Sequence, residues 1–191
     1  MRKLICRLTL LFFILSPGLL QAQETTDYSL MLNAGKFIPP ANITSLTKND
    51  PLLRNSLFNG RYYVTIQFSS LPTNEMKEQL AAAGIRLLDY IPNLAYTASV
   101  DANVDLATLR SFPVRSVIQF SPAQKTVPDL LTNTVAAYAR KVSGFADADI
   151  VLYENMSAAQ VNASLQEAGA VILADVPVFR MMTVRIPEAN V

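Results

Sequence analysis

Apolar and polar side chains alternate strictly along residues 61–68. The apolar positions are Tyr62, Val64, Ile66 and Phe68, and the positions between them are Arg61, Tyr63, Thr65 and Gln67. Successive side chains of a strand point to opposite faces of a sheet, so this alternation predicts a β-strand with one buried face. We expect the apolar set to face the core.

The next stretch, residues 72–84, has a helical period. Pro-Thr-Asn at its start is typical of a helix N-terminus. Gly84 is expected to end the helix, because glycine is frequent just past a helix C-terminus. Met76, Leu80 and Ala83 are spaced at i, i+4 and i+7, which places them on one apolar stripe. A helix that packs against the preceding strand is expected.

Two short strands are predicted after this helix. They cover residues 85–90 and 94–100, and Ile91, Pro92 and Asn93 between them indicate a turn.

A second helix and a last strand complete the unit. The helix is expected within residues 103–113, where Leu106, Leu109 and Phe112 share one side and Pro113 ends the helix. The strand is expected over residues 114–122.

The order strand, helix, strand, strand, helix, strand is that of a ferredoxin-like (βαββαβ) domain of the α+β class. Two helices would cover one face of a four-stranded antiparallel sheet. The other face would stay open and present Tyr63, Thr65, Gln67, Thr97, Ser99, Val117 and Gln119. This assignment depends on alternation, and a slip of one residue would invert the set.

A weaker copy of the pattern recurs at a fixed offset of 85 residues. The matching pairs are Ile66 and Val151, Phe68 and Tyr153, Leu80 and Leu165, Ala83 and Ala168, Gly84 and Gly169, Leu88 and Leu173, and Pro92 and Pro177. Ser157 and Gln160 give the second helix a capping-box start. We interpret the match as an internal repeat; the alternative is coincidence between two helix–strand segments built from common residues.

The second copy is expected to be incomplete, with the order βαββ. Its last helix and strand are missing before Val191, which would leave a strand edge unpaired. We therefore expect either a truncated piece of a longer protein or a second unit that something else completes.

The N-terminus has the plan of a secretory signal peptide over residues 1–22. A basic start precedes a short uncharged apolar run, a helix-breaking Ser-Pro-Gly and a small residue, Ala22, at the cleavage point. The alternative, a membrane anchor, requires a longer apolar run. We expect an exported protein, periplasmic, at the cell surface or extracellular, with no membrane contact after the signal is removed.

The rest of the chain divides into four expected segments. They are a lead-in segment at 23–60, the first domain at 61–125, a linker at 126–146 and the second, truncated domain at 147–191.

Composition excludes the commonest enzymatic chemistries. The chain has no histidine, and its one cysteine, Cys6, would leave with the signal peptide. A Ser-His-Asp triad, a Cys-His pair and a histidine or thiolate metal site are therefore impossible. We predict no catalytic residue, no metal site and no cofactor.

The remaining residues offer two other kinds of binding site, one for a cation and one for nucleic acid. Asp147 and Asp149 share one strand face and could touch a cation, but calcium needs six or more oxygen ligands, so solvation of a strand entrance is the preferred interpretation. Nucleic-acid binding by this fold needs several outward aromatic residues and a basic surface. Tyr63 is a lone outward candidate and the net charge without residues 1–22 is −2, so no nucleic-acid partner is expected.

The stretch YYVTIQFSSLPTNEMKEQLAAAGIRLLDYIPNLAYTASVD, followed by LRSFPVRSVIQFSPAQKTVPDLL, resembles the pro-region of secreted bacterial subtilisin-like serine peptidases, most closely the fervidolysin type. The likeness lies in a strand-helix unit leading to G-I-x-L-L-x-Y-I-P-N-x-A-Y and in a P-x-x-K element at Pro122–Lys125. The later ADIVLYENMSAAQVNASLQEAGAVIL resembles a second propeptide-inhibitor domain.

This resemblance implies a precursor in which the pro-domain packs its open sheet face against the catalytic domain. There it would assist folding and block the active site until it is cut away. The chain carries no catalytic domain, so it is not expected to be an enzyme itself. Its expected partner is a subtilisin-like catalytic domain, in cis or in trans.

The residues expected to contact this partner are Tyr63, Thr65, Gln67, Val117 and Gln119. Two alternative functions remain open: a free-standing secreted protease inhibitor, and an extracellular structural or adhesion module without a protease partner.

Overall fold

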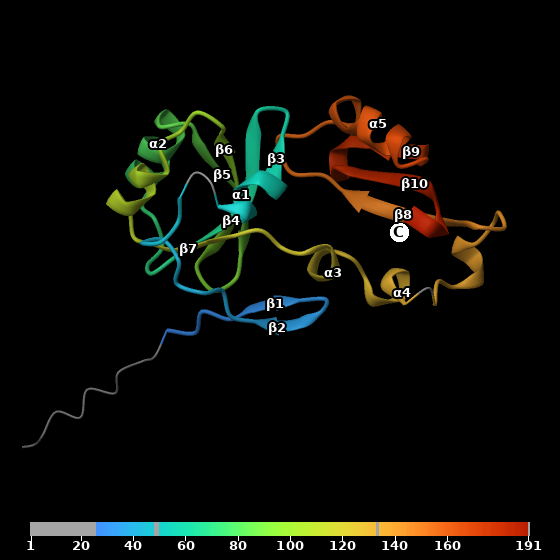
Figure 1. Cartoon of the computed structure of the whole chain (residues 1–191), viewed down its shortest axis with the longest axis horizontal. Coiled ribbons are helices and arrows are strands. Elements are labelled where there is room, and N and C mark those ends of the chain that lie inside the picture. The colour runs from blue at the N-terminus through green and yellow to red at the C-terminus, as the bar shows by residue number, and fades with distance from the viewer. Residues whose placement is uncertain (1–25, 48–49, 133, 191) are drawn as a thin grey trace, which may run out of the picture.

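Three antiparallel sheets organise the chain in a computed structural model that describes residues 26–47, 50–132 and 134–190. A two-stranded hairpin precedes a five-stranded sheet, called the first sheet, and a three-stranded sheet, called the second sheet, follows (Figure 1). The predicted α+β class is confirmed. The expected signal peptide, residues 1–22, lies outside the described residues.

The first sheet is antiparallel throughout. Its strands are β3 (Leu57–Phe58), β4 (Arg61–Phe68), β5 (Ile85–Ile91), β6 (Ala95–Asp101) and β7 (Val114–Ile118). The order is β3-β4-β6-β5. On the side of β4 away from β6, β3 pairs with the N-terminal end of β4 and β7 pairs with its C-terminal half. Strand β4 is therefore central.

The alternation along β4 selects its core face as predicted. Val64, Ile66 and Phe68 are buried beneath helix α2 (Asn74–Ala82), where Leu80 is fully buried among them. The helix begins where Thr73 Oγ1 accepts the Met76 N–H at 3.3 Å, an N-cap that satisfies one free donor of the first turn.

The second helix of this unit differs from the prediction. Residues Leu106–Ser111 form a 3₁₀ helix, η1, and not an α-helix. In a 3₁₀ helix side chains at i and i+3 eclipse, so Leu106 and Leu109 stack on one side and both are buried in the core. Asp105 caps the segment by accepting the Ala107 N–H at 2.9 Å.

The segment before β4 carries structure of its own. Strands β1 (Leu30–Leu32) and β2 (Gly35–Phe37) form the hairpin, and helix α1 (Pro51–Ser56) leads into β3. Between β2 and α1 the described residues contain turns but no helix or strand.

A long connection joins the two large sheets. It contains α3 (Pro122–Lys125), α4 (Pro128–Leu131) and the 3₁₀ helix η2 (Ala137–Ala139), and α3 and α4 lie below the second sheet in Figure 1. Helix α4 ends at Leu131, and Thr132 is its C-cap.

The second sheet has the order β8-β10-β9 and is also antiparallel. Its elements are β8 (Phe145–Val151), α5 (Ala158–Glu167), β9 (Val171–Val176), the 3₁₀ helix η3 (Pro177–Phe179), β10 (Met181–Pro187) and the terminal 3₁₀ helix η4 (Glu188–Asn190). Helix α5 lies on one side of this sheet (Figure 1), and the core between them centres on Leu152, Met182 and Val184.

One detail of the expected repeat is wrong. Val151 and Tyr153 do not take the core-facing places of Ile66 and Phe68, because Ile150 and Leu152 face α5 instead. A slip of one residue moves every side chain of a strand to the other face.

In the part of the chain that the structure describes, no helix combines the length and apolar character needed to cross a bilayer.

Candidate functional site

The face of the first sheet opposite α2, called the covered face, carries three of the five residues predicted to contact a partner. Tyr63, Thr65 and Gln67 point to it from β4, but their relative exposures are only 7%, 3% and 0%. The expectation that this face is open is therefore wrong. Contact between these three residues and a partner stays a prediction that requires the covering segments to move.

The other two predicted residues come from β7 and the residue after it. Val117 pairs with Ile66 and lies in the core beneath α2, so its expected orientation is wrong. The neighbours of Val117 take its place on the covered face, since Ser116 pairs with Gln67 and Ile118 with Thr65. The outward-facing residues of β7 therefore differ by one position from the expected ones.

Gln119 lies just past the end of β7 and is half-buried. Its Nε2 donates to the carbonyl of Asn55 at 2.7 Å, which ties the end of β7 to helix α1.

Gln67 is the centre of the contact that closes one end of the covered face. Its Nε2 donates to the carbonyls of Tyr28 and Asn93, both at 2.9 Å, and its Oε1 accepts from Arg115 Nη1 at 3.1 Å. Buried amides are stable only when their donors and acceptors are paired, and here each is. Gln67 thereby joins the N-terminal segment, the β5–β6 turn and β7.

The N-terminal segment seals this end with apolar and cationic contacts. The guanidinium of Arg115 lies 4.3 Å from the ring centroid of Tyr28 and donates to the Pro39 carbonyl at 2.7 Å. Leu30 is fully buried in a small cluster with Ala95 and Ile118. Hairpin β1–β2 is therefore part of the first unit and not a passive lead-in.

The second unit covers the other end of the same face. The ring of Tyr153, from the segment between β8 and α5, lies 4.9 Å from that of Tyr63, and Asn155 Nδ2 donates to Ser99 Oγ at 3.0 Å. Burial raises the pKa of both phenols, and for Tyr153 the adjacent Tyr63 raises the pKa further.

An ion pair at the rim joins the two units a second time. Arg180 donates through both Nη atoms to the carboxylate of Asp89, each at 2.9 Å, in the two-point geometry that suits guanidinium and carboxylate. Hydrogen bonding to Asp89 raises the pKa of Arg180. Arg180 has a left-handed backbone with φ of 53°, which directs its side chain out of its own unit.

The face of the second sheet opposite α5, called the free face, remains accessible. It carries alternate residues of β8 and β10 and the residues of β9 that pair with them, among them Asp147, Asp149, Val151, Thr183, Arg185, Ala174 and Val171. Val151 and Val171 have relative exposures of 71% and 57%.

Polar groups of the free face pair across the strands. Arg185 donates to both carboxylate oxygens of Asp147 at 2.7 and 2.8 Å, and Thr183 Oγ1 donates to Asp149 at 2.7 Å. The hydrogen bond from Arg185 lowers the pKa of Asp147 despite partial burial, with a smaller effect from Lys141. The two aspartates thus have protein partners, which supports the structural interpretation over the cation site.

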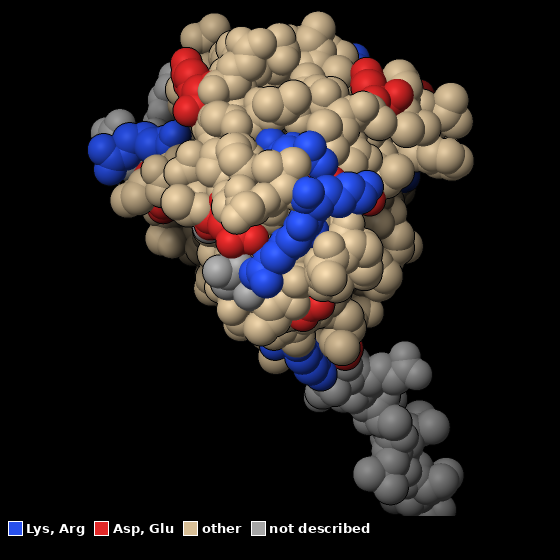
Figure 2. Space-filling view, turned by 90° about the vertical axis from the view of Figure 1, so that its right-hand side faces the viewer, with Lys and Arg blue, Asp and Glu red and all other residues tan. Residues whose placement is uncertain are grey.

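Charges of both signs lie among mostly uncharged side chains when the molecule is viewed from the right-hand side of Figure 1 (Figure 2).

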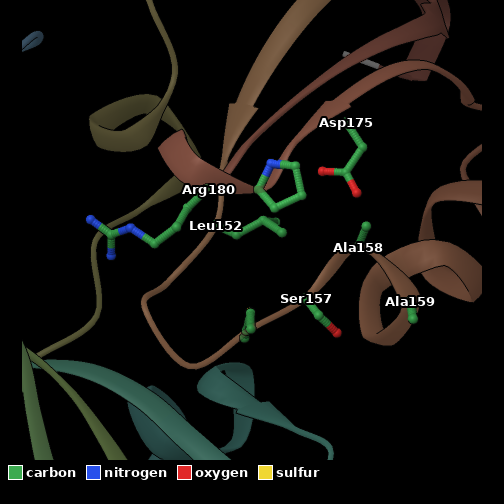
Figure 3. A pocket seen from close by; sticks show the side chains of 8 residues that line it. Leu152, Ser157, Ala158, Ala159, Asp175 and Arg180 are labelled. Carbon is green, nitrogen blue, oxygen red and sulfur yellow. The ribbon is translucent and has the colours of Figure 1, made fainter.

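A pocket lies where α5 begins. It has a volume of about 310 Å³ and is lined mainly by apolar atoms of residues from the segment after β8, from α5, and from both sides of η3. Figure 3 shows the Asp175 carboxylate beside Ala158, whereas the Arg180 guanidinium extends away from the other labelled residues.

The residues that close the covered face were missed because their partners are distant in sequence. Tyr153 was expected in a core, and Arg115 and Arg180 carried no local signal. The positive φ of Asn93 (67°) fits the predicted turn. An asparagine in this turn was the one hint in the sequence that its carbonyl is placed for a special contact.

The comparison with known families gives one match. Residues 31–121 match the model described as Domain of unknown function (DUF8729), so over that range the chain is similar to this family. The range begins in β1 and ends three residues after β7, and it includes the whole first sheet. Neither the curated proteins nor the solved structures contain a match to the chain.

Proposed function

We propose that this protein is an exported binding module, namely the pro-region of a subtilisin-like serine peptidase that acts as folding chaperone and inhibitor of the catalytic domain. The proposal rests on the sequence resemblance over about residues 60–187 and on a two-sheet architecture with one accessible sheet face. The catalytic domain would be the partner, in the same precursor or on a separate chain.

The arrangement of the first sheet supports a ferredoxin-like unit. Strands β7, β4, β6 and β5 follow one another across the sheet, all antiparallel, and this is the order that a split βαβ motif requires. Helix α2 and the 3₁₀ helix η1 contribute Leu80 and Leu109 to the same core. In this proposal η1 takes the place of the second helix.

The pairing in the second sheet supports a second, shorter copy. Ile150 pairs with Met182 as Val64 pairs with Ala98, and all four face the helix of their own unit. Leu80 and Leu165 keep the offset of 85, whereas the first strand is offset by 86 and the third by 84.

The first strand is shifted by one residue in one direction and the third strand by one residue in the other. Because these strands are antiparallel, equivalent residues still pair with each other. Glycine follows both helices in a left-handed conformation, with φ of 83° at Gly84 and 72° at Gly169. Shared pairing and a shared helix end support common ancestry of the two units better than common composition does.

The free face is the proposed contact surface. The covered face is already packed against the chain's own segments, whereas Val151 and Val171 remain exposed on a sheet of the same plan. The accessible free face is the observation that carries this choice. The two valines lie at opposite corners of the sheet, with the paired polar groups between them. Exposed apolar side chains on a sheet face are typical of protein interaction sites.

Inhibition kinetics test the proposal. The chain from residue 23 onward is incubated with a subtilisin-type peptidase, and hydrolysis of a chromogenic peptide is followed over time. We expect tight inhibition that is relieved slowly as the protein is degraded. Val151→Asp combined with Val171→Asp should weaken inhibition at least about tenfold, since a buried unpaired charge at an interface costs more than one decade of affinity.

Val127→Asp is the matched control, because Val127 is an exposed valine in the connection before α4. It should inhibit as the unaltered chain does. Absence of inhibition at micromolar concentration would contradict the proposal and favour the alternative of a structural or adhesion module. That alternative has one observation of its own, which is that the covered face is closed without any partner.

A further inference from the structure

The pocket at the start of α5 lies in a place that side chains fill in the first unit. Its walls come from Leu152 at the end of the first strand, Ala158 and Ala159 in the first turn of the helix, and Asp175 and Pro177 at the β9–η3 junction. In the first unit the same elements are the end of β4, the start of α2 and the β5–β6 turn.

Three aromatic rings occupy this place in the first unit. The ring of Tyr96 packs edge-on against those of Phe68 and Tyr90, with centroids 6.1 and 5.1 Å apart. Lys77, in α2, places its ammonium 5.3 Å from the centroid of the Tyr96 ring. Tyr96 therefore fills the space between the sheet and the beginning of α2.

The second unit has no ring at the corresponding positions. Leu152 donates its N–H to the Arg180 carbonyl at 2.8 Å, and these two residues correspond to Ile66 and Tyr96, which pair in the first sheet. Arg180 thus stands where Tyr96 would, and its side chain reaches Asp89 in the first unit instead of the pocket (Figure 3). Asp175, also at the pocket wall, pairs with Met182, the counterpart of Ala98.

We infer that this pocket binds the aromatic side chain of a tyrosine presented by a partner polypeptide. The apolar walls match the face of a ring, and the first unit demonstrates that this framework accommodates one. The Asp175 carboxylate at the wall can accept a hydrogen bond from a phenol, so tyrosine is favoured over phenylalanine. This inference rests on the repeat proposed above.

Titration with small ring compounds tests the inference without a peptidase. N-acetyl-L-tyrosinamide is added to the ¹⁵N-labelled chain from residue 23 onward, and amide chemical shifts are followed by NMR. We expect saturable shifts at Ala158, Ala159 and Asp175 at roughly millimolar concentration, the range for a ligand of this size. N-acetyl-L-phenylalaninamide should bind more weakly, and N-acetyl-L-leucinamide should cause no saturable shift there.

Two variants separate pocket filling from general damage. Ala158→Phe places a ring in the pocket and should abolish the shifts, whereas Ala163→Phe, on an exposed position of the same helix, should leave them intact. Asp175→Ala removes the hydrogen-bond acceptor and should remove most of the difference between the tyrosine and phenylalanine compounds without removing binding. Dispersed spectra of each variant verify folding.

Equal shifts with the leucine compound, or shifts that persist in Ala158→Phe, would overturn the inference. Chemical-shift changes at the pocket that follow protein concentration without any added compound would also overturn the inference. A second copy of the chain would then occupy the pocket. Because no peptidase enters the titration, its failure leaves the inhibition assay unaffected, and a failed inhibition assay leaves this titration unaffected.

Discussion

At the scale of single residues, one buried amide holds three distant parts of the chain together. Gln67 bonds to Tyr28, Asn93 and Arg115, which belong to the N-terminal segment, a turn and a strand. A buried polar side chain on a covered sheet face favours a single packing arrangement, because only one arrangement of the neighbouring segments pairs all its hydrogen-bonding groups.

Gln67→Leu should therefore destabilise the protein by about 3 kcal/mol, since it leaves two carbonyls and a guanidinium without their partner. Urea unfolding followed by circular dichroism measures the change. Gln119→Leu is the control, because that side chain is half-exposed and donates a hydrogen bond to the Asn55 carbonyl. A change below about 0.5 kcal/mol for Gln67→Leu would show that water replaces the lost bonds.

Gly84 limits substitution for a second reason. Its φ of 83° disfavours any side chain, and a Cβ there would lie 2.9 Å from Val104 Cγ2. Gly84→Ala should cost about 2 kcal/mol, whereas Gly60→Ala, which has φ of 73° and open space around it, should cost about 1 kcal/mol from backbone strain alone. Thermal unfolding compares the two, and equal losses would exclude the steric contribution of Val104.

At the scale of elements, local patterns predicted those whose signal is local. Strand β4 and helix α2 follow from alternation, from the 3.6-residue period and from Gly84. The character of η1 did not follow, because Leu106 and Leu109 satisfy α-helical and 3₁₀ spacing alike. The facing of β7 was missed because it is set by pairing with β4, where Ser116 and not Val117 meets Gln67.

The pair of Asp147 and Arg185 makes the second sheet sensitive to acid. The lowered pKa of Asp147 means that its contribution to stability is present above the pKa of the unfolded chain and is lost as pH falls through the folded pKa. Between about pH 5 and pH 2, wild-type stability should fall more steeply than that of Asp147→Asn.

Urea midpoints at a series of pH values measure this difference. Asp149→Asn is the matched control, because Asp149 accepts from a hydroxyl and not from a guanidinium. It should retain the wild-type slope. Parallel curves for wild type and Asp147→Asn would contradict the assignment.

At the scale of the whole molecule, small contacts set the relation of the two units. Asn155 donates to Ser99, and two further contacts are the adjacent rings of Tyr63 and Tyr153 and the ion pair of Arg180 with Asp89. Neither could be predicted from the sequence, because each joins residues about 90 positions apart that have no common local pattern. The predicted contact residues of β4 accordingly lie on a face that other segments of the chain cover, which the sequence did not indicate.

Tyr153→Ala should loosen this arrangement. Small-angle scattering should give a larger radius of gyration, and the pKa of Tyr63 should move down toward its ordinary value because its ring becomes solvated. Absorbance titration of the phenols measures the second effect. Tyr138→Ala, at a well-exposed tyrosine of the connection, should change neither quantity, and an unaltered radius for Tyr153→Ala would show that the ion pair alone suffices.

The stacking of Tyr153 on Tyr63 also has a consequence for biosynthesis. The ribosome completes strands β4 to β7 before it reaches Tyr153. A nascent first unit can therefore bury its α2 side while the Tyr63 end of the covered face is still exposed to solvent. Chaperones that capture bare sheet surfaces would meet this intermediate, and their release would coincide with emergence of the segment that begins the second unit.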